Sequence, residues 1–366
     1  MGKKTVAAFI VILIAVVAGS GCIESLIDLP TVYQTHPVRI RYMLRYGYNI
    51  SCSGAGEYEI KYLCNKPSVA SGNITVAEIL YQKDYEHVEL VNNSFIRWDI
   101  KSSESSSYEL GINIYVDAES LMVSDLNGEK AFSIKQIKLM YPGLVDQYCH
   151  PQSMENKTYI DPDHVVVKTV AENIVDGLDT DNSFVVAKML FIWLKENTRY
   201  EKHEEDKALP QPANLTYELR SGDCDDLSYL YISLCRAVGI PARLIRGFLI
   251  KEDRNGSVNV FPHAWTEVFV GGNLGDNGWI PVECAGSGGS VKADVHQNFG
   301  LEDCFHLRLF VDDGSNESLN ISSSGPQVFY EQGMQVDMFS FAMITGYESL
   351  LSKKLVVTKN NIRSYT

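Results

Sequence analysis

The clearest pattern of apolar positions begins just after residue 223. Apolar residues stand at 227, 230, 231, 234, 235 and 238, and this spacing places all of them on one face of a helix. Gly239 and Pro241 follow as a stop signal. Shorter patterns of the same period cover 167–178 and 185–194. We therefore predict three helices in the middle of the chain, each with one buried face.

Alternating patterns on both sides of these helices predict strands. Four strand-like segments, separated by clusters of Gly, Asn and Ser, precede the helices: 38–44, 58–63, 74–80 and 108–115. Four more follow them: 242–250, 264–270, 279–284 and 305–311. Short strands at such spacing are typical of an antiparallel sandwich, and the Gly-rich stretch 271–278 predicts a hairpin. The predicted fold class is α+β, with an N-terminal antiparallel β-sandwich and a strand-rich C-terminus.

The first residues have the composition of an export signal. Lys3 and Lys4 precede an apolar run at 6–17, which is too short for a stable membrane span, and small residues then lead to Cys22. This order resembles a lipobox, which implies cleavage before Cys22 and a lipid on its thiol. Ordinary signal-peptide cleavage and an uncleaved anchor are the alternatives. All three predict an exported protein, and the first predicts an extracellular lipoprotein that contacts the membrane only through its N-terminus.

Glycosylation motifs agree with export. Eight Asn-x-Ser/Thr triplets without proline suit a glycosylated cell-surface protein. They begin at Asn49, Asn73, Asn92, Asn156, Asn214, Asn255, Asn316 and Asn320.

The charge of the chain excludes some partners. The formal net charge is −14, from 32 basic and 46 acidic residues. A strongly acidic protein is not attracted to nucleic acid or to anionic membranes. We expect no nucleic-acid partner.

The cysteines divide into three groups. Of the eight, Cys22 is assigned to lipid attachment and Cys224 to chemistry. The even remainder permits disulfides in an oxidising compartment, and Cys52 with Cys64 is the best local pair. The connectivity of the others stays open: Cys149, Cys235, Cys284 and Cys304.

Three short motifs supply a nucleophile, a base and an orienting group. Cys224 opens the third helix, where free N–H groups and the helix dipole favour a thiolate. Asp223, Asp225 and Asp226 carry opposing charges, so a histidine partner is required.

His263 is the candidate base, because the predicted hairpin brings it close to a carboxylate. Strand alternation puts His263 and Trp265 on one face. Glu283, at the end of the next strand, then lies within a few residues of a position opposite His263 and is suited to fix its tautomer. Cys284 points the other way.

Residues 165–290 resemble the transglutaminase-like superfamily. The family's motifs appear in order as Gly222 to Cys224, Gly239 to Arg243, His263 to Trp265, and Trp279 to Glu283. The resemblance implies a papain-like core with Cys224 as nucleophile, His263 as general base and acid, and Glu283 as the group that orients His263. It also implies a preceding β-sandwich, as in relatives.

One position departs from the family. The third catalytic residue is usually Asp, and Glu283 is one methylene longer, which leaves room for an inactive relative.

The backbone N–H of Cys224 is one expected oxyanion donor, and the loop before it offers Gln211, Asn214 or Tyr217 as the second.

We expect neither a metal nor a cofactor. The remaining histidines show no ligand spacing, and the acidic stretch 201–206 reads as a solvated loop. These histidines are His36, His87, His150, His164, His203, His296 and His306.

The sequence as a whole predicts an enzyme that transfers acyl groups through a Cys224 thioester. Peptidase or amidase action is favoured over cross-linking, and the expected substrate is a protein or peptide, with a cell-envelope component among the candidates. The alternative is an inactive cell-surface binding or scaffold protein on the same fold. The expected divisions are a signal peptide at 1–21, a tether at 22–35, the sandwich at 36–150, the transglutaminase-like catalytic domain at 160–305 and a β-rich extension at 306–366.

Overall fold

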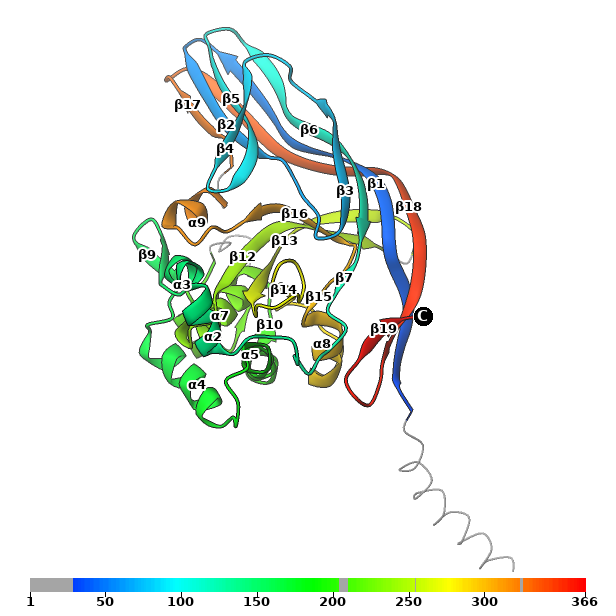
Figure 1. Ribbon diagram of the computed structural model, residues 1–366. Helices are drawn as coiled ribbons and strands as arrows, with labels where there is room; N and C mark the ends of the chain where they lie inside the picture. The colour runs from blue at the N-terminus through cyan, green and yellow to red at the C-terminus, as the bar shows by residue number, and fades with distance from the viewer. Residues whose placement is uncertain (1–28, 204–209, 254, 323–324) are drawn as a thin grey trace, which may run out of the picture.

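Two bodies make up the protein, and a pair of long strands runs along both of them (Figure 1). One body is a β-sandwich and the other a sheet covered by helices. The computed structural model describes residues 29–203, 210–253, 255–322 and 325–366. The predicted signal peptide, the lipobox-like run and Cys22 lie outside these residues. None of the described helices combines the length and the apolar character that crossing a membrane requires.

The sandwich is built from two antiparallel sheets. The first has the order β19-β18-β1-β6-β3. Its strands are β1 (Thr31–Gly54), β3 (Gly72–Ile79), β6 (Ser106–Glu119), β18 (Met334–Val357) and β19 (Arg363–Tyr365). The second has the order β17-β2-β5-β4. Its strands are β2 (Tyr58–Asn65), β4 (Tyr85–Leu90), β5 (Asn93–Ser102) and β17 (Gln327–Tyr330).

The inner faces of these sheets form one apolar core. Along β1, alternate residues such as Tyr42 and Leu44 are fully buried, and they pack in one cluster with Ile60 and Trp98 from the second sheet. Burying each large apolar side chain contributes about 1.5–3 kcal/mol. The alternation of apolar and polar residues in the sequence therefore corresponds to the inner and outer faces of the sandwich.

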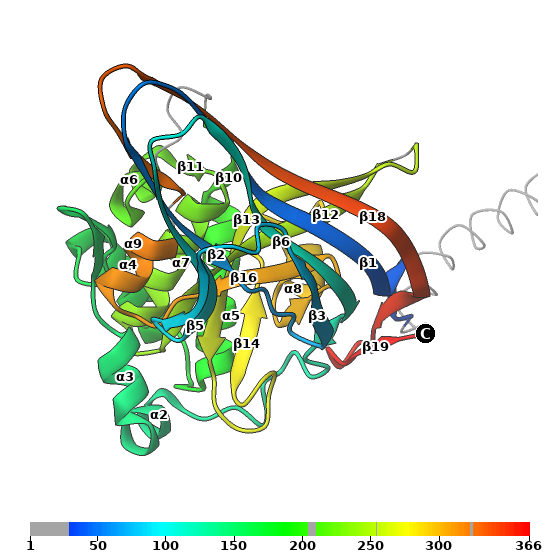
Figure 2. The ribbon, with the colours of Figure 1, turned by 90° about the horizontal axis from the view of Figure 1, so that it is seen from above.

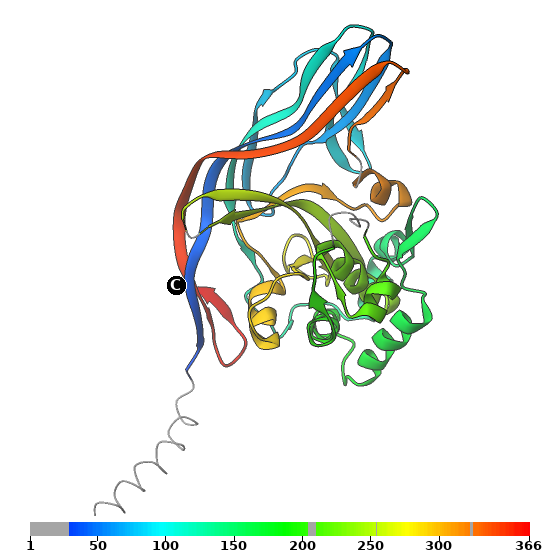
Figure 3. The same cartoon turned by 180° about the vertical axis from the view of Figure 1, so that it is seen from behind.

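A strand from the C-terminal part of the chain, β18, completes the N-terminal sandwich. β18 pairs with β1 from Thr31↔Val357 to Gly54↔Met334. Register shifts interrupt the pair between Val32 and Met43, and such bulges bend a strand. Figure 3 shows the pair curving from the sandwich down the flank of the second body. Residues that the sequence assigns to a separate extension at 306–366 thus contribute to the sandwich.

The second body is organised around one antiparallel sheet, in the order β14-β13-β12-β16. Its strands are β12 (Ala242–Glu252), β13 (Val258–Phe269), β14 (Trp279–Val282) and β16 (His306–Val311). β16 belongs to this sheet, so the predicted boundary between 305 and 306 cuts through it. Figure 2 shows helices clustered beside the sheet, with α7 among them.

The three predicted helices are confirmed, but α7 is buried on every side from Asp226 to Arg236 and not on one face alone. They are α4 (Val165–Asp176), α5 (Ser183–Asn197) and α7 (Cys224–Ala237). The other described helices are α2 (Ile134–Met140), α3 (Pro142–Tyr148), α6 (Ala213–Leu219), α8 (Val291–Asn298) and α9 (Asn316–Ser322). Short strands complete the body: β7 (Leu121–Met122), β8 (Gln152–Met154), β9 (Lys157–Ile160), β10 (Arg199–Tyr200), β11 (Ser221–Gly222) and β15 (Leu301–Glu302).

Two helices fall inside the range predicted to be a sandwich. α2 begins with a capping box between Ser133 and Gln136, and α3 begins at Pro142. Each is only seven residues long, which is too short for a helical period to stand out in the sequence.

Two sets of contacts fasten the bodies together. Ile250 and Val260, near the tip of the β12–β13 hairpin, pack into the sandwich core. The buried guanidinium of Arg363, on β19, donates to the carbonyls of Phe299 and Gly300 on the second body.

A buried chain of ions ties the central sheet. The Arg308 guanidinium lies 2.6 Å from a carboxylate oxygen of Glu267 and 2.6 Å from one of Glu302. Arg243 binds the other oxygen of Glu267, and the indole N–H of Trp265 donates to Glu302. Burial alone would raise the pKa of Glu267, but Arg308 and Arg243 bring it below its usual value. Burial of these charges is tolerated because each of them meets an opposite charge.

The predicted pairing of Cys52 with Cys64 is wrong. Both thiols are free and buried, with Cys52 on β1 in the first sheet and Cys64 on β2 in the second. The other described cysteines, among them Cys149, Cys235, Cys284 and Cys304, are also free thiols.

The ion chain gives a test of the fold. Arg308→Met leaves Glu302 and Glu267 buried with fewer cations, so we expect a loss of about 3–5 kcal/mol in the free energy of unfolding. Urea unfolding followed by circular dichroism measures it. Arg97→Met, which removes the exposed ion pair with Glu86, is the control and should leave the midpoint close to that of the parent. Equal midpoints for the two variants would contradict the role given to Arg308.

Candidate active site

The start of α7 is fixed by a reciprocal cap. The Asp223 carboxylate accepts from the N–H groups of Asp225 and Asp226, and Asp226 accepts from the N–H of Asp223. Cys224 is the first residue of the helix. A side chain at Gly222 would come within 2.5 Å of Asp226, so only glycine fits before the cap.

Asp226 also holds the preceding loop against the helix. This fully buried carboxylate accepts from the backbone N–H and the side-chain amide of Gln211, and it lies 2.7 Å from His203 Nε2. His203 therefore packs on the helix start, although the sequence assigns it to a solvated loop. The charged residues around His203 predict a solvated loop, and nothing in their order indicates that His203 has the buried Asp226 as its partner.

The candidate second oxyanion donors lie in different surroundings. Gln211 is attached to the helix start, as described. The ring of Tyr217 stacks on Trp193 with centroids 6.1 Å apart, and Asn214 lies in the first turn of α6. Among the three, Gln211 is the one whose backbone and side chain donate hydrogen bonds to Asp226, in the first turn of α7.

The thiol of Cys224 lies in an unfavourable place for a negative charge. Burial raises its pKa to about 12, and the carboxylates of Asp225 and Asp223 act in the same direction. The backbone N–H of Ala264 points toward the sulfur and opposes this effect. The resting group is consequently a thiol rather than a thiolate, so a base must remove its proton.

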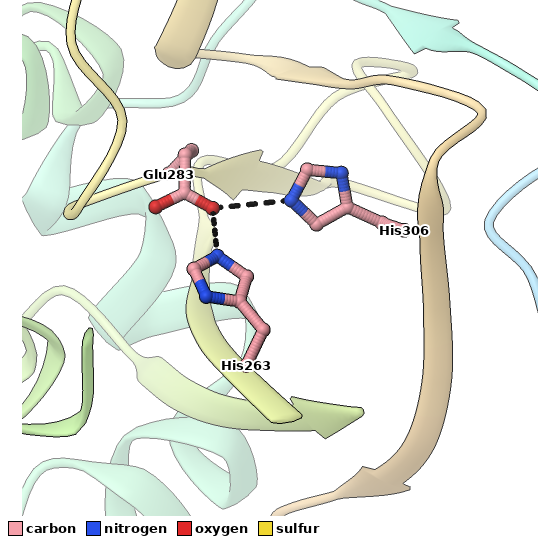
Figure 4. A group of neighbouring side chains, drawn as sticks. All are labelled: His263, Glu283 and His306. Carbon is pink, nitrogen blue, oxygen red and sulfur yellow. Dashed lines mark hydrogen bonds and ion pairs between the residues drawn. The ribbon is translucent and has the colours of Figure 1, made fainter. Parts of the chain in front are cut away.

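His263 and Glu283 form the pair that the sequence predicts. β13 pairs with β14 from Phe269↔Trp279 to Thr266↔Val282, which brings the residue after β14 beside His263. The His263 Nε2 atom lies 2.6 Å from Glu283 Oε2 (Figure 4). The carboxylate thus fixes the orientation of the ring and leaves Nδ1 as the nitrogen that can exchange a proton.

Both oxygens of Glu283 are used. Oε1 accepts from the backbone N–H groups of Ala285 and Gly286, at 2.7 and 3.0 Å, while Oε2 faces His263. The backbone can approach so closely because Gly286 has no side chain; a Cβ there would lie 2.8 Å from the Glu283 side chain. The longer glutamate therefore bends back onto its own loop and is held there.

A second histidine shares the same carboxylate oxygen. His306, on β16, places Nε2 3.1 Å from Glu283 Oε2 (Figure 4). Its Nδ1 atom lies 2.7 Å from Asp303 Oδ1. Burial alone would lower the pKa of His306, but Asp303 and Glu283 raise it well above its usual value. No pattern in the sequence gives His306 a role, and its three-residue spacing from Asp303 is the only local signal.

Glu283 is held ionised by these neighbours. Burial would raise its pKa, but His263 and His306 keep it well below the usual range for a carboxyl group. Trp265 lies against both imidazoles, with ring centroids 5.9 Å from His263 and 4.8 Å from His306. It is 1% exposed, so it is a core residue that supports the two rings.

Two clusters among the described residues bring three metal-type donor atoms within 4.8 Å of one another. One is His263, Glu283 and His306, and the other is His203, Asp223 and Asp226. Both could hold a metal by distance alone. In each, the carboxylate oxygen shared at the centre already accepts hydrogen bonds from its neighbours. These hydrogen bonds account for both clusters without an ion.

A cavity of about 510 Å³ opens beside the pair. Its wall includes His263, Glu283 and His306, together with Tyr200, Phe261 and other side chains. Tyr200 pairs with Gly222 across β10 and β11, so it joins the cavity to the segment just before Cys224. No sequence pattern distinguishes Tyr200 from the other tyrosines.

Comparison with known proteins identifies the domain. Residues 168–284 match the family model of the transglutaminase-like superfamily, so the chain contains a transglutaminase-like domain. The uncharacterized protein YebA of Bacillus subtilis (strain 168) is 29% identical over 134 residues, which are 32% of this chain and 17% of YebA. The match therefore spans less than a fifth of that relative.

Solved structures show similarity at low identity. One is a candidate cysteine protease from Cytophaga hutchinsonii, with 14% identity and a TM-score of 0.48, covering 92% of this chain and 100% of that chain. Another is the periplasmic domain of TgpA from Pseudomonas aeruginosa, with 11% identity and a TM-score of 0.34, covering 69% of this chain and 93% of that chain.

The ionised state of Glu283 predicts a pH-dependent stability. A carboxyl group whose pKa is lowered by folding stabilises the fold above its unfolded pKa, and this contribution disappears as the pH falls through the folded value. Glu283→Gln should therefore lose roughly 2–4 kcal/mol at pH 6, and the difference from the parent should shrink between about pH 5 and pH 2.

Urea unfolding at a series of pH values measures this difference. Glu109→Gln, which changes an exposed ion pair with Arg45, is the matched control and should show no comparable trend. A loss for Glu283→Gln that stays constant down to pH 2 would mean that the carboxyl group is not ionised in the fold.

Proposed function

We propose that the protein is a thiol-dependent acyl-transfer enzyme that acts on protein or peptide amides. The observation that carries the proposal is the His263–Glu283 hydrogen bond beside a helix that begins with Cys224, within a transglutaminase-like domain. This order of nucleophile, base and orienting carboxylate is the arrangement that activates a weak nucleophile.

The first half of the reaction forms a thioester. His263 Nδ1 takes the proton of the Cys224 thiol as the sulfur attacks the carbonyl carbon, so that an S–C bond forms and the carbonyl electrons move to oxygen. When the carbonyl re-forms, the C–N bond breaks and the leaving amine takes the proton from His263. Glu283 stabilises the imidazolium that exists between these steps.

The developing oxyanion needs donors at the helix start. In the described first turn of α7, the N–H groups of Asp223, Asp225 and Asp226 are bonded to carboxylates. The N–H of Cys224 is the one left for an incoming oxygen. The raised pKa of the thiol fits this scheme, because the proton leaves only as attack proceeds.

The second half decides the product. Water attacks the thioester in a peptidase or amidase, whereas a lysine amine attacks it in a transglutaminase; His263 removes the nucleophile's proton in both. The superfamily resemblance favours hydrolysis, and the cavity beside His263 gives the second nucleophile and the substrate a place to enter.

Acylation by a small ester tests the proposal without knowledge of the substrate. Purified protein that starts at residue 29 is mixed with p-nitrophenyl acetate at neutral pH, and intact-mass analysis detects an acetyl group. We expect one acetyl adduct that is absent in Cys224→Ala and forms about 10²–10⁴-fold more slowly in His263→Ala. Cys284→Ala, which removes a buried thiol, is the matched control and should acylate like the parent.

The inactive alternative makes the opposite prediction. A surface scaffold on this fold would show no Cys224 adduct in protein whose circular dichroism is that of the folded parent. Acetylation that persists in Cys224→Ala would likewise overturn the proposal.

We also propose that the protein is exported and anchored by a lipid on Cys22. The lipobox-like run supports this, and so do the glycosylation motifs, since seven of the eight asparagines are exposed and Asn214 is half-buried.

The full chain should partition with membranes in the producing cell, and Cys22→Ser should release it into the medium. Retention of Cys22→Ser in the membrane fraction would favour an uncleaved anchor instead, and release of both forms would favour ordinary cleavage.

A further inference from the structure

His306 makes two hydrogen bonds that define its protonation state. Each of its ring nitrogens faces a carboxylate oxygen, of Glu283 on one side and Asp303 on the other. Ionised carboxylates only accept hydrogen bonds, so both nitrogens must carry a proton. His306 is 6% exposed, so the ring itself has little contact with water. The ring is therefore a buried imidazolium between two carboxylates.

This cation acts on the same oxygen that orients His263. Glu283 Oε2 lies 2.6 Å from His263 and 3.1 Å from His306, and the two imidazole centroids are 5.6 Å apart. Without a cation, the charge of Glu283 would stabilise the protonated form of His263, which cannot act as a base. His306 offsets that charge while it holds the carboxylate in place.

We propose that His306 is a positioning residue that fixes Glu283 on His263 and keeps His263 available as the base. The inference rests on the proposed function of Cys224. In this arrangement His306, supported by Asp303, sets the pH range in which the Cys224 thiol can be acylated.

The charged groups around His263 determine the direction of the effect. Glu283 and His306 face it from the end of β14 and from β16. Asp225 on α7 also acts on the charge of His263, and Asp225 is paired with Arg246 on β12. Loss of the His306 charge makes this environment more negative. Protonated His263 is then favoured, and the acid limb of the acylation rate moves to higher pH.

The protonation state of His306 is tested directly by nitrogen NMR. The probe is Cys224→Ala protein with ¹⁵N-labelled histidine, observed at pH 8, where an unperturbed histidine is neutral. We expect one histidine whose two ring nitrogens both have the chemical shifts of an imidazolium. These signals should be absent from the double variant that also carries His306→Gln. A neutral His306 at pH 8 would overturn the proposal, and this measurement does not depend on catalysis.

The functional part is tested by the pH dependence of Cys224 acetylation by p-nitrophenyl acetate. In His306→Gln, which retains a donor toward Glu283 but has no charge, the pH of half-maximal rate on the acid side should rise by about one unit. His296→Gln is the matched control, because His296 is equally buried, at 4% exposed, and has its pKa lowered to about 4 mainly by burial. It should leave the profile in place.

The outcomes separate the two proposals. A uniform loss of rate in His306→Gln with an unmoved acid limb means a merely structural role and overturns the inference. A rate in the parent that EDTA abolishes and zinc restores would also overturn it, since the cluster would then be a metal site. If the parent shows no acetylation at all, the proposed function fails, and the nitrogen spectrum still decides whether His306 is a cation.

Discussion

Arg308 lies with its guanidinium between Glu267 and Glu302, in a part of the central sheet that excludes water. A buried cation is tolerated only where its partners are fixed, so this ion chain constrains how the strands of the sheet lie beside one another. The strand β12 passes between β13 and β16, and its Gly247 is the register partner of both His263 and Arg308. A side chain at Gly247 would lie 1.9 Å from the Leu307 carbonyl. The chain of charges and this glycine together bring the strands that carry His263 and His306 into alignment.

The exchange of aspartate for glutamate has a geometric explanation in this framework. A longer carboxylate has one more rotatable bond, and its freedom must be removed before it can orient an imidazole. Here the two backbone N–H groups of Ala285 and Gly286 hold one oxygen, and two histidines hold the other. The side chain that departs from the family's usual residue is therefore hydrogen-bonded at both of its carboxylate oxygens.

Local patterns explain what the sequence could predict. The helical period after Cys224, the hairpin and the pairing of His263 with Glu283 all follow from residues close together in the chain. Other features follow from long-range pairing and were not predictable. β1 and β18 are separated by almost the whole chain, and nothing in either strand specifies its partner. His306 comes into contact with Glu283 only when β16 pairs with β12 in the sheet. Its local spacing from Asp303 is equally compatible with a surface turn.

The curved β1–β18 pair also determines how the molecule bears load. β1 starts at Thr31, which is the register partner of Val357 at the end of β18, and the C-terminus lies near this point in Figure 1. Hydrogen bonds between antiparallel strands run perpendicular to the strands. Tension applied to the chain before Thr31 therefore acts along the pair as shear, spread over many hydrogen bonds at once, and passes along the flank into the sandwich.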